Sequence, residues 1–518
     1  MDGFYFYYII DYMKSSESNI NRREFLKYST AAAAAITVVP SSVLGGDSAV
    51  PPSERITFAL IGCGTQGIRE LPGMISSKRI QFVAVCDPNR ESYDYIDWSR
   101  DGLRRDVANL LNKPDWRSNA PGIPGGREVV KEIIELYYGN KKESGKYSGC
   151  NSYADFRELL EKEKDLNAVK IMTPDHLHAT IAVAALKKGK RVMMHKPIAN
   201  RVAEGRTVIE TARKTGIPTH FLPANVGPQI SLALKLVKSG AIGRLKEIHN
   251  WSNRPVWPQY TKLPEDKPPI PPGFDWDLWL GPSLPRPYHP HYTHAVFRGW
   301  YEFGGGAIAD MGHYSLWRVF QELQLDPPLM VESAPTHVCE IQNLVSRKIV
   351  NDYSFPLACT VRFRFAKKGD RPEVDLFWYD GGVKPATPEE LISYNQELPP
   401  EGLMFIGTGG IIIGGFTGEN LRMITNGKIQ PVDKSVADST PLPSGYVGWE
   451  EAFMGKGKSY GDFTLALAIT DAFNLAAVSL RMGGRRLLWD ATAMKITNLP
   501  DANKYLTREY RKGWELTI

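Results

Sequence analysis

Cysteine is scarce in this sequence: the 518 residues contain five, at positions 63, 86, 150, 339 and 359. Their spacing is not that of metal ligands, which argues against a metal site built on cysteine. Cys63 and Cys86 are expected at the ends of neighbouring strands, where they could approach each other. Burial as small apolar side chains is the better interpretation.

An excess of charge of one sign is also missing. The formal net charge is +6, part of it lies in the N-terminal segment, and no stripe of lysine and arginine with interleaved aromatic residues is present. A nucleic-acid surface needs such a stripe, so we expect no nucleic-acid partner. The apolar content of 42% and the charged content of 23% are ordinary for a soluble globular protein, and the length predicts more than one domain.

The N-terminal segment lacks an apolar run long enough to span a membrane. Its Ala-rich stretch, residues 31–39, is too short. That stretch follows a twin-arginine pattern in residues 21–27 and precedes Pro40 and a run of small residues. This order predicts a signal peptide over residues 1–50 that exports the protein by the twin-arginine route, to the periplasm or another extracytoplasmic location. No stable membrane span is expected after its removal.

The stretch from Ile56 to Asp87 has the pattern of a dinucleotide-binding βαβ unit. An apolar strand leads into three glycines spaced as G-x-G-x-x-G, a helical segment follows, and a second strand ends at the aspartate. Gly62 permits the tight turn, Gly64 the close approach of a pyrophosphate, and Gly67 the packing of helix on strand. The free N–H groups at the start of the helix would bind the anion.

Asp87 distinguishes between the two nicotinamide dinucleotides. Its carboxylate can accept hydrogen bonds from a ribose 2′-hydroxyl and would repel a 2′-phosphate. We therefore predict NAD as the cofactor, with NADP the less favoured alternative. Thr65 and Gln66 lie inside the same glycine loop, at the start of the helix, and are predicted to contact the cofactor with the glycines.

Alternating strand and helix patterns over residues 54–224 predict a doubly wound parallel sheet, with a polar insertion at about 91–150. Residues 225–460 differ in character, because hairpin patterns over 330–440 favour a mainly antiparallel sheet. Gly407-Thr-Gly-Gly410 is interpreted as a hairpin turn and not as a second phosphate loop. Residues 461–518 are predicted to form a long helix and a tail that pack back on the core.

Two loops at the carboxyl ends of predicted strands should face the nucleotide, because ligands of doubly wound sheets bind at that edge. The first begins at Thr173-Pro174 and continues through His176 and His178, and all four residues are predicted to contact the cofactor. Metal binding by the two histidines is rejected, since no third ligand has suitable spacing. A second histidine cluster at 289, 291 and 294 lacks an acidic partner nearby, so we predict no metal.

Lys196 lies in the second of these loops, directly after the strand predicted for residues 191–194. From there its ammonium group could bond a substrate hydroxyl and stabilise a developing alkoxide. Asp310 and His313 lie beside a glycine triplet at a helix start, where the aspartate could orient a catalytic base. Capping of the helix is the alternative role for this aspartate.

Together these residues resemble the glucose–fructose oxidoreductase/inositol dehydrogenase/MocA (Gfo/Idh/MocA) family. The matching motifs are the glycine loop, Thr173-Pro-Asp-His-x-His178-Ala, Lys196-Pro197, and Gly304-Gly-Gly-x-x-x-Asp310-x-Gly. The chain also resembles the exported subgroup with a twin-arginine signal, through Trp257-Pro-Gln, Trp276-Asp-Leu-Trp-Leu-Gly-Pro282, Arg286-Pro-Tyr-His289-Pro and the ending Arg511-Lys-Gly-Trp-Glu-Leu.

The resemblance implies an α/β fold, with an N-terminal Rossmann domain and a C-terminal α/β domain built on an open, mostly antiparallel sheet. It also implies a homo-oligomer formed through that sheet, and NAD(P)-dependent oxidation or reduction of a ring hydroxyl or keto group of a sugar, polyol or glycoside. Aromatic side chains from Trp251 to Trp300 would stack on sugar faces. One alternative is a glycosidase that oxidises its substrate transiently, eliminates the aglycone, adds water and reduces again. A non-enzymatic sensor or binding protein that carries a dinucleotide is a third functional alternative.

The chain departs from the family pattern at two positions. The glutamate that precedes the family's lysine is His195 here, and the family's histidine four residues after the aspartate is Tyr314. A histidine stands one residue early, at His313, which on a helix is a rotation of about 100°. Either His313 reaches the site through a shifted turn, or Tyr314 takes the acid/base role.

Overall fold

The apolar, β-branched runs of the first half of the chain form a six-stranded parallel sheet in the order β3-β2-β1-β4-β5-β6. This order is that of the doubly wound dinucleotide-binding fold, with its switch point between β1 and β4. The strands are β1 (Ile56–Ile61), β2 (Ile80–Cys86), β3 (Asn151–Tyr153), β4 (Ala168–Ile171), β5 (Arg191–Met194) and β6 (Thr219–Phe221). The predicted Rossmann sheet is therefore confirmed.

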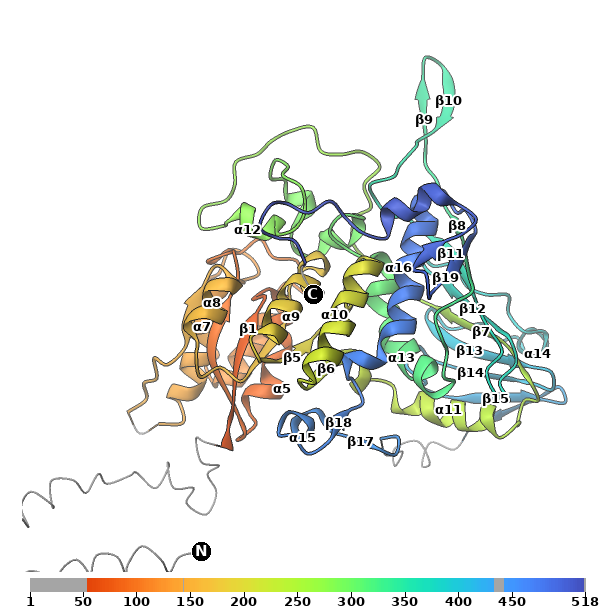
Figure 1. Cartoon of the computed structure of the whole chain (residues 1–518), viewed down its shortest axis with the longest axis horizontal. Coiled ribbons are helices and arrows are strands. Elements are labelled where there is room, and N and C mark those ends of the chain that lie inside the picture. The colour runs from red at the N-terminus through yellow and green to blue at the C-terminus, as the bar shows by residue number, and fades with distance from the viewer. Residues whose placement is uncertain (1–53, 143, 433–441, 517–518) are drawn as a thin grey trace, which may run out of the picture. The chain divides into compact units, whose positions relative to one another are not determined.

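The structure is a computed structural model that describes residues 54–142, 144–432 and 442–516 (Figure 1). The predicted signal peptide over residues 1–50, with its twin-arginine pattern, lies outside the described residues. From Ile56 onward the described chain belongs to one compact unit. Among the helices described, we find none that combines the length and the apolar character needed to cross a membrane.

Helices join the strands of the parallel sheet, and local sequence sets their ends. The Asp155 side chain caps α8 by accepting the N–H of Arg157, and Gly216 ends α10 in a left-handed conformation with φ of +63°. The polar insertion contributes two of these helices, α6 and α7. The helices are α4 (Thr65–Glu70), α5 (Pro72–Ile75), α6 (Gly102–Leu111), α7 (Arg127–Gly139), α8 (Phe156–Lys162), α9 (Asp175–Lys187) and α10 (Val202–Thr215).

The second half of the chain forms a ten-stranded sheet in the order β16-β15-β14-β13-β7-β12-β11-β8-β19-β20. Every neighbouring pair is antiparallel except β7 with β12, which confirms the predicted, mostly antiparallel sheet. The glycines after β13 make a hairpin turn, in which the Gly407 N–H donates to the Gly410 carbonyl. The strands are β7 (Leu245–Trp251), β8 (Met330–Pro335), β11 (Cys359–Phe365), β12 (Val374–Tyr379), β13 (Gly402–Gly407), β14 (Ile411–Gly414), β15 (Arg422–Thr425), β16 (Lys428–Pro431), β19 (Leu487–Asp490) and β20 (Lys495–Ile496).

The remaining elements surround the two sheets. A hairpin of β9 (Cys339–Gln342) and β10 (Val345–Lys348) projects away from them in Figure 1. The other elements are α11 (Pro228–Lys238), α12 (Trp276–Leu280), α13 (His313–Glu322), α14 (Glu389–Ser393), α15 (Trp449–Phe453), α16 (Leu467–Arg481), β17 (Tyr446–Val447), β18 (Lys458–Ser459), the 3-10 turns η2 (Leu222–Asn225), η3 (Pro290–Tyr292), η4 (His294–Gly299), η7 (Phe463–Leu465) and η8 (Pro500–Tyr505), and the π-helical turn η5 (Ile308–Gly312).

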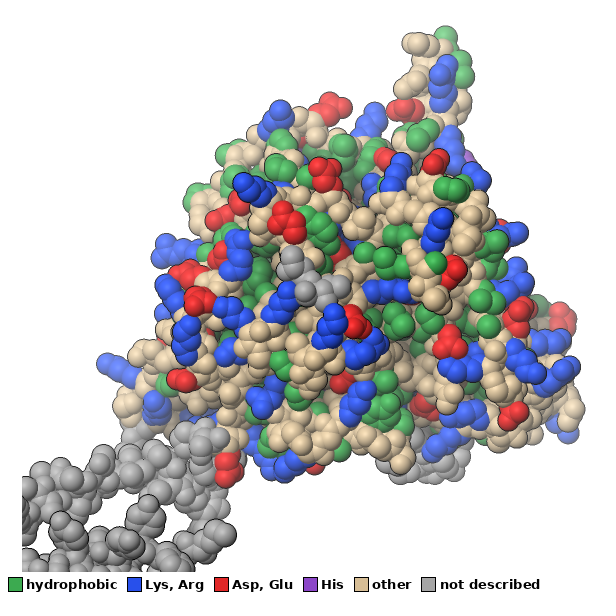
Figure 2. Space-filling view, in the orientation of Figure 1, with side chains coloured by type: hydrophobic (Ala, Val, Ile, Leu, Met, Phe, Trp, Pro, Cys, Tyr) green, Lys and Arg blue, Asp and Glu red, His purple; other side chains and the backbone are tan. Residues whose placement is uncertain are grey.

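The C-terminal residues contact the Rossmann part of the chain. Helices α10 and α16 pack together between the two sheets (Figure 1). The Arg206 guanidinium binds Asp471 of α16, and Arg508 donates from Nε to Glu204 Oε1 over 2.6 Å in a fully buried pair. The predicted boundaries at residues 224 and 460 stay predictions. On the face that Figure 2 shows, basic and acidic side chains are interspersed.

Candidate active site

The loop between β1 and α4 is built around glycine. Gly62 has φ of +100°, and a Cβ there would lie 2.5 Å from the Met172 carbonyl carbon. A Cβ on Gly67 would lie 2.5 Å from the Gly62 carbonyl oxygen. Contacts this short would displace the backbone, so the turn and the packing of the helix on the strand both require glycine. The sequence rationale for these two glycines therefore matches the geometry.

Asp87, at the end of β2, is fixed against this loop. Its Oδ2 accepts the Cys63 N–H over 2.7 Å, and its Oδ1 accepts the Asn89 N–H over 2.8 Å. Burial raises the pKa of the Asp87 carboxyl, and the two N–H groups oppose that rise. Each carboxylate oxygen retains one lone pair, and the side chain lines a cavity at the carboxyl edge of the sheet.

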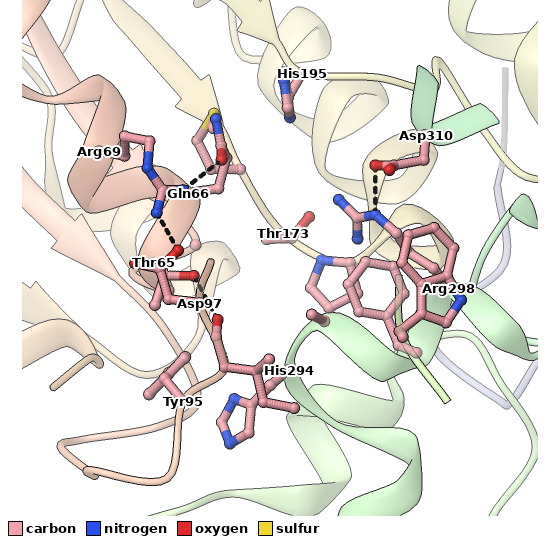
Figure 3. Close-up of a pocket in the computed structure, with 18 of the residues that line it drawn as sticks. Thr65, Gln66, Arg69, Tyr95, Asp97, Thr173, His195, His294, Arg298 and Asp310 are labelled. Atoms are coloured by element: carbon pink, nitrogen blue, oxygen red, sulfur yellow. Dashed lines mark hydrogen bonds and ion pairs between the residues drawn. The ribbon is translucent and has the colours of Figure 1, made fainter. Parts of the chain in front are cut away.

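This cavity brings together residues from both halves of the chain (Figure 3). Its outer wall comes from the glycine loop and the insertion that follows β2. Its inner wall comes from the loops after β4 and β5 and from the segment that contains η4 and η5. The predicted residues that line it are Gly62, Gly64, Thr65, Gln66, Asp87, Thr173, Pro174, Lys196, Asp310 and Tyr314.

Residues 94–98, here called the covering segment, lie against the glycine loop. The Tyr95 ring lies 3.2 Å from where a Cβ of Gly64 would be. Thr65 donates its hydroxyl to the Ile96 carbonyl, and Arg69 of α4 forms an ion pair with Asp97. These contacts attach the insertion to both ends of α4, and the start of this helix is the position at which a pyrophosphate binds in this fold.

The covering segment is attached to the second half of the chain by His294. The imidazole packs against Tyr95 with ring centroids 4.1 Å apart and ring planes tilted by 48°, and its Nε2 lies 3.3 Å from Asp94 Oδ1. Figure 3 shows Tyr95 and His294 together at one side of the cavity and Asp310 at the other. Sequence reasoning treated the insertion only as polar, so it did not identify this contact.

Asp310 is the centre of a buried charge cluster at the inner end of the cavity. Lys196 Nζ donates to Oδ1, Arg298 Nε donates to the same oxygen over 2.8 Å, and Arg254 Nε lies 3.8 Å from Oδ2. Burial alone would raise the pKa of Asp310, but Lys196 and Arg298 hold it well below its usual range. Burial lowers the pKa of Lys196, and Asp310 opposes this effect.

Tyr314 and His195 form the second polar group of the inner end. His195 Nε2 and Tyr314 Oη are 2.6 Å apart and share a hydrogen bond, and Glu70 Oε1 lies 3.5 Å from the same nitrogen. Burial lowers the pKa of His195 to about 3, which Glu70 opposes. Burial, and next Asp310, raise the pKa of Tyr314. A neutral imidazole therefore faces a neutral phenol at neutral pH.

His313 is not part of the cavity. It is 1% exposed, its Nδ1 bonds the Ala309 carbonyl, and its ring packs between Phe221 and Phe473. The π-helical turn before α13 places Asp310 and Tyr314, four positions apart, on the cavity side, while His313 faces the core. Of the two open alternatives for the acid/base residue, only Tyr314 reaches the cavity.

His176 and His178 also lie outside the cavity lining, although both were predicted to contact the cofactor. His176 Nε2 bonds the Trp279 carbonyl, and the two nitrogens of His178 bond the Pro197 and Thr173 carbonyls. Both rings are almost fully buried. In this structure they join the loops after β4 and β5 to each other and to α12.

Thr173 provides a test of whether the cavity fits a dinucleotide. Its hydroxyl oxygen is buried, lines the cavity, and has no hydrogen-bond partner among the described residues. Buried hydroxyls are normally satisfied, so this one is free for a bound group. Together with the glycine turn and Asp87, it fits a nicotinamide dinucleotide. No set of three or more metal-ligating side chains occurs in the described part of the chain.

The aromatic side chains of residues 251–300, which were predicted to stack on sugar rings, fall into two groups. Trp257, Phe274, Trp279 and Phe297 line the cavity. Trp251, Trp276 and Trp300 are core residues that are at most 6% exposed and do not line it. Trp98 of the covering segment is 61% exposed and also lines the cavity. Sequence analysis missed Trp98, Arg254 and Arg298, since none of them belongs to a recognisable motif.

Two models of one oxidoreductase family match the chain. Residues 116–220 match the NAD-binding Rossmann fold of the GFO_IDH_MocA oxidoreductase family, and residues 229–350 match its C-terminal alpha/beta domain. The first match begins after the glycine loop and includes Lys196. The second includes Arg254, Arg298, Asp310 and Tyr314.

Curated relatives match over part of their length. Levoglucosan dehydrogenase of Pseudarthrobacter phenanthrenivorans is 30% identical over 146 residues, which are 27% of this chain and 36% of that protein. Glycosyl hydrolase family 109 protein 1 of a Shewanella species is 23% identical over 243 residues, which are 44% of each chain. The chain thus matches less than half of the length of either relative.

A solved structure shares the fold. The WlbA dehydrogenase of Chromobacterium violaceum, in complex with NADH and UDP-GlcNAcA, aligns with a TM-score of 0.50 and 16% identity, over 86% of this chain and 98% of that chain. Identity this low shows a common fold and nothing finer. The stretches 116–220 and 229–350 thus match the two domains of the Gfo/Idh/MocA oxidoreductase family, and the two sheets of the structure have the arrangement of that fold.

Proposed function

We propose that the protein is an NAD-dependent dehydrogenase that transfers hydride between the cofactor and a ring carbon of a sugar, polyol or glycoside. One observation carries the proposal: Lys196, Asp310 and Tyr314 line the same cavity as the glycine loop and Asp87. A donor, its counter-charge and a proton-transfer group thus surround the space beside the predicted nucleotide site. The relatives named as dehydrogenases favour the same reaction class.

The chain's own residues would supply charge stabilisation and proton transfer. When bound, NAD provides the hydride acceptor at its nicotinamide ring. Lys196, held by Asp310, would donate a hydrogen bond to the substrate oxygen and stabilise the negative charge that develops there. Tyr314 would take the hydroxyl proton as its own proton moves to His195 Nε2, and the Glu70 carboxylate would stabilise the imidazolium that results.

NAD is proposed in preference to NADP on the basis of Asp87. Two backbone N–H groups hold its carboxylate in place, so it cannot readily turn away from a 2′-phosphate. Parallel titrations of the protein with NADH and NADPH, followed by nicotinamide fluorescence, test this preference. Equal affinities would contradict it.

A redox-assisted glycosidase is the second candidate. The covering segment favours it, because a cofactor enclosed beneath Tyr95 and Asp97 would be available to accept hydride and return it within one turnover. The glycosyl hydrolase name of a curated relative is compatible with this reaction. Both candidates use the same residues up to the first hydride transfer, so the net products distinguish them.

A spectrum of the purified protein is the direct test. Residues 47–518 would be expressed, and absorbance near 340 nm recorded before and after each member of a glycoside panel is added. A lasting rise that is absent in Lys196→Met supports the dehydrogenase. Cleavage of the glycoside with no lasting rise supports the glycosidase, and failure to bind NAD contradicts both.

We further propose export by the twin-arginine route and assembly as a homo-oligomer. The arginine pair at residues 22–23 and the apolar stretch that follows support the first proposal. Substitution of both arginines by lysine should retain the protein in the cytoplasm of a producing cell. Light scattering of the purified protein tests the second, since a monomer mass would contradict it.

A further inference from the structure

The inner end of the cavity carries more positive than negative charge. Lys196, Arg254 and Arg298 surround the single carboxylate of Asp310. The next carboxylate, Asp175, is 3% exposed and accepts the Gly305 N–H at its Oδ2. Glu70, near His195, is paired with Lys170 over 2.9 Å and leaves this balance unchanged. Even with Asp310 and Asp175 both ionised, three cations therefore face two anions. An uncompensated charge in a partly desolvated site is costly, so the site is suited to a ligand that brings a negative charge.

Arg254 is the cation with the weakest internal pairing. Its Nε is buried and has no hydrogen-bond partner among the described residues, and Asp310 Oδ2 lies 3.8 Å away. Its Nη1 donates to the neighbouring Asn253 side chain. Arg298 uses Nε for Asp310, and a guanidinium has further N–H groups for a second acceptor. Two guanidinium groups beside one cavity are well suited to a carboxylate, which they can bind in bidentate fashion.

Trp98 supplies an apolar face beside these charges. The Arg254 guanidinium lies 5.0 Å from the centroid of its ring, and the indole is 61% exposed at the cavity. At this distance the guanidinium is within cation–π range of the indole, which helps to fix its position beside the ring. An exposed indole next to a fixed cation can bind a pyranose ring and an attached acidic group together.

We propose that the substrate is an acidic carbohydrate, whose carboxylate is bound by Arg254 and Arg298 and whose ring lies on Trp98. The inference rests on the proposed function, since it assigns the substrate class of the same site. The positive charge of the oxidised nicotinamide would add to the cationic excess, so a neutral sugar would leave that excess uncompensated. A carboxylate brings the total close to neutrality.

The test compares acids with the neutral sugars from which they differ only at C6. Three pairs are used: glucuronate with glucose, galacturonate with galactose, and mannuronate with mannose. Binding to the NAD-loaded protein is measured by calorimetry and by initial rates at 340 nm. At least one acid should bind tenfold or more tightly than its neutral partner, and added salt should reduce this preference.

Variants assign the preference to its residues. Arg254→Gln should remove most of the preference for the acid and leave the affinity for NAD unchanged. Trp98→Ala should weaken the binding of the acid and the binding of its neutral partner by similar factors. Arg244→Gln, an exposed arginine outside the cavity lining, is the matched control and should change neither.

Three outcomes would overturn the proposal. The first is that no acid in the panel binds more tightly than its neutral partner. The second is that the preference for the acid persists in Arg254→Gln. The third is that Arg254→Gln weakens the binding of NAD as strongly as the binding of the acid. The anion bound by Arg254 would then be a phosphate of the dinucleotide. Failure to bind NAD is measured separately, by titration without sugar, and contradicts the proposed function itself.

Discussion

His195 Nε2 lies 2.6 Å from Tyr314 Oη, so the two positions at which this chain departs from the family pattern are in direct contact. The family pattern has an acid at the first position and an imidazole at the second. Here the imidazole stands at the first position and the weakly acidic phenol at the second. A hydrogen-bonded pair of an acid and a base is therefore present with its members exchanged.

Tyr314→Phe should lower kcat by roughly 100- to 10,000-fold, because the phenol that relays the substrate proton to His195 is lost. Binding of NADH should change little, since the ring that lines the cavity remains. Steady-state rates and NADH fluorescence titrations measure the two effects. Tyr394→Phe, which removes an exposed phenol elsewhere, serves as the control. An unchanged kcat would show that Tyr314 is not the proton-transfer group.

Asp310→Asn should destabilise the fold by about 3–5 kcal/mol, because it leaves three neighbouring cations without their carboxylate. Lys196→Met should destabilise less, since Asp310 keeps Arg298 and Arg254 as partners. Urea unfolding of both variants at pH 7 measures the difference in free energy of unfolding. Equal losses would mean that the cluster is not centred on Asp310.

Asp97→Asn should accelerate the release of bound NADH several-fold, because it breaks the ion pair that attaches the covering segment to α4. Stopped-flow fluorescence after mixing with excess NAD follows the release. The control is Asp101→Asn, which breaks the exposed pair with Arg104 and should leave the release rate unchanged. A release rate equal to that of the parent protein would show that the segment does not retain the cofactor.

The stability that Glu70 contributes should disappear in acid. Burial alone would raise its pKa, but His195, once it is protonated in acid, and Lys170 and Gln66 lower it from 4.5 to about 2. A carboxyl whose pKa is lower in the folded state contributes its full stability above pH 4.5 and loses it as the pH falls to about 2. Glu70→Gln should thus be less stable than the parent protein at pH 6. The difference should shrink steadily below pH 4.5 in urea unfolding series, and a constant difference would contradict the assignment.

Local patterns predicted the parts of the site that are contiguous in sequence. The glycine loop and Asp87 lie within one βαβ unit, where the order of strand, turn and helix fixes the geometry. Lys196 was predicted for the same reason, as the residue after a strand end. These predictions needed no knowledge of contacts between distant segments.

The other residues of the site are brought together by contacts between segments that are distant in sequence. Arg254 and Arg298 reach Asp310 only because the second half of the chain folds against the Rossmann sheet. Trp98 lines the cavity because the insertion returns over the glycine loop. The choice between His313 and Tyr314 depended on a π-helical turn that has no simple sequence signal. Periodicity predicted a rotation between the two residues, and tertiary packing determined which of them faces the cavity.

The covering segment has a consequence for the order of substrate binding. A dinucleotide retained beneath Tyr95 and the pair of Arg69 with Asp97 would behave as a prosthetic group, and its oxidation state would persist after a product has left. A reductant and an oxidant must then use the same cavity in succession. Initial rates with two sugars would give parallel lines in double-reciprocal plots, the ping-pong pattern. The midpoint potential of the bound couple, and not the ratio of free NADH to NAD, would set the direction of the reaction.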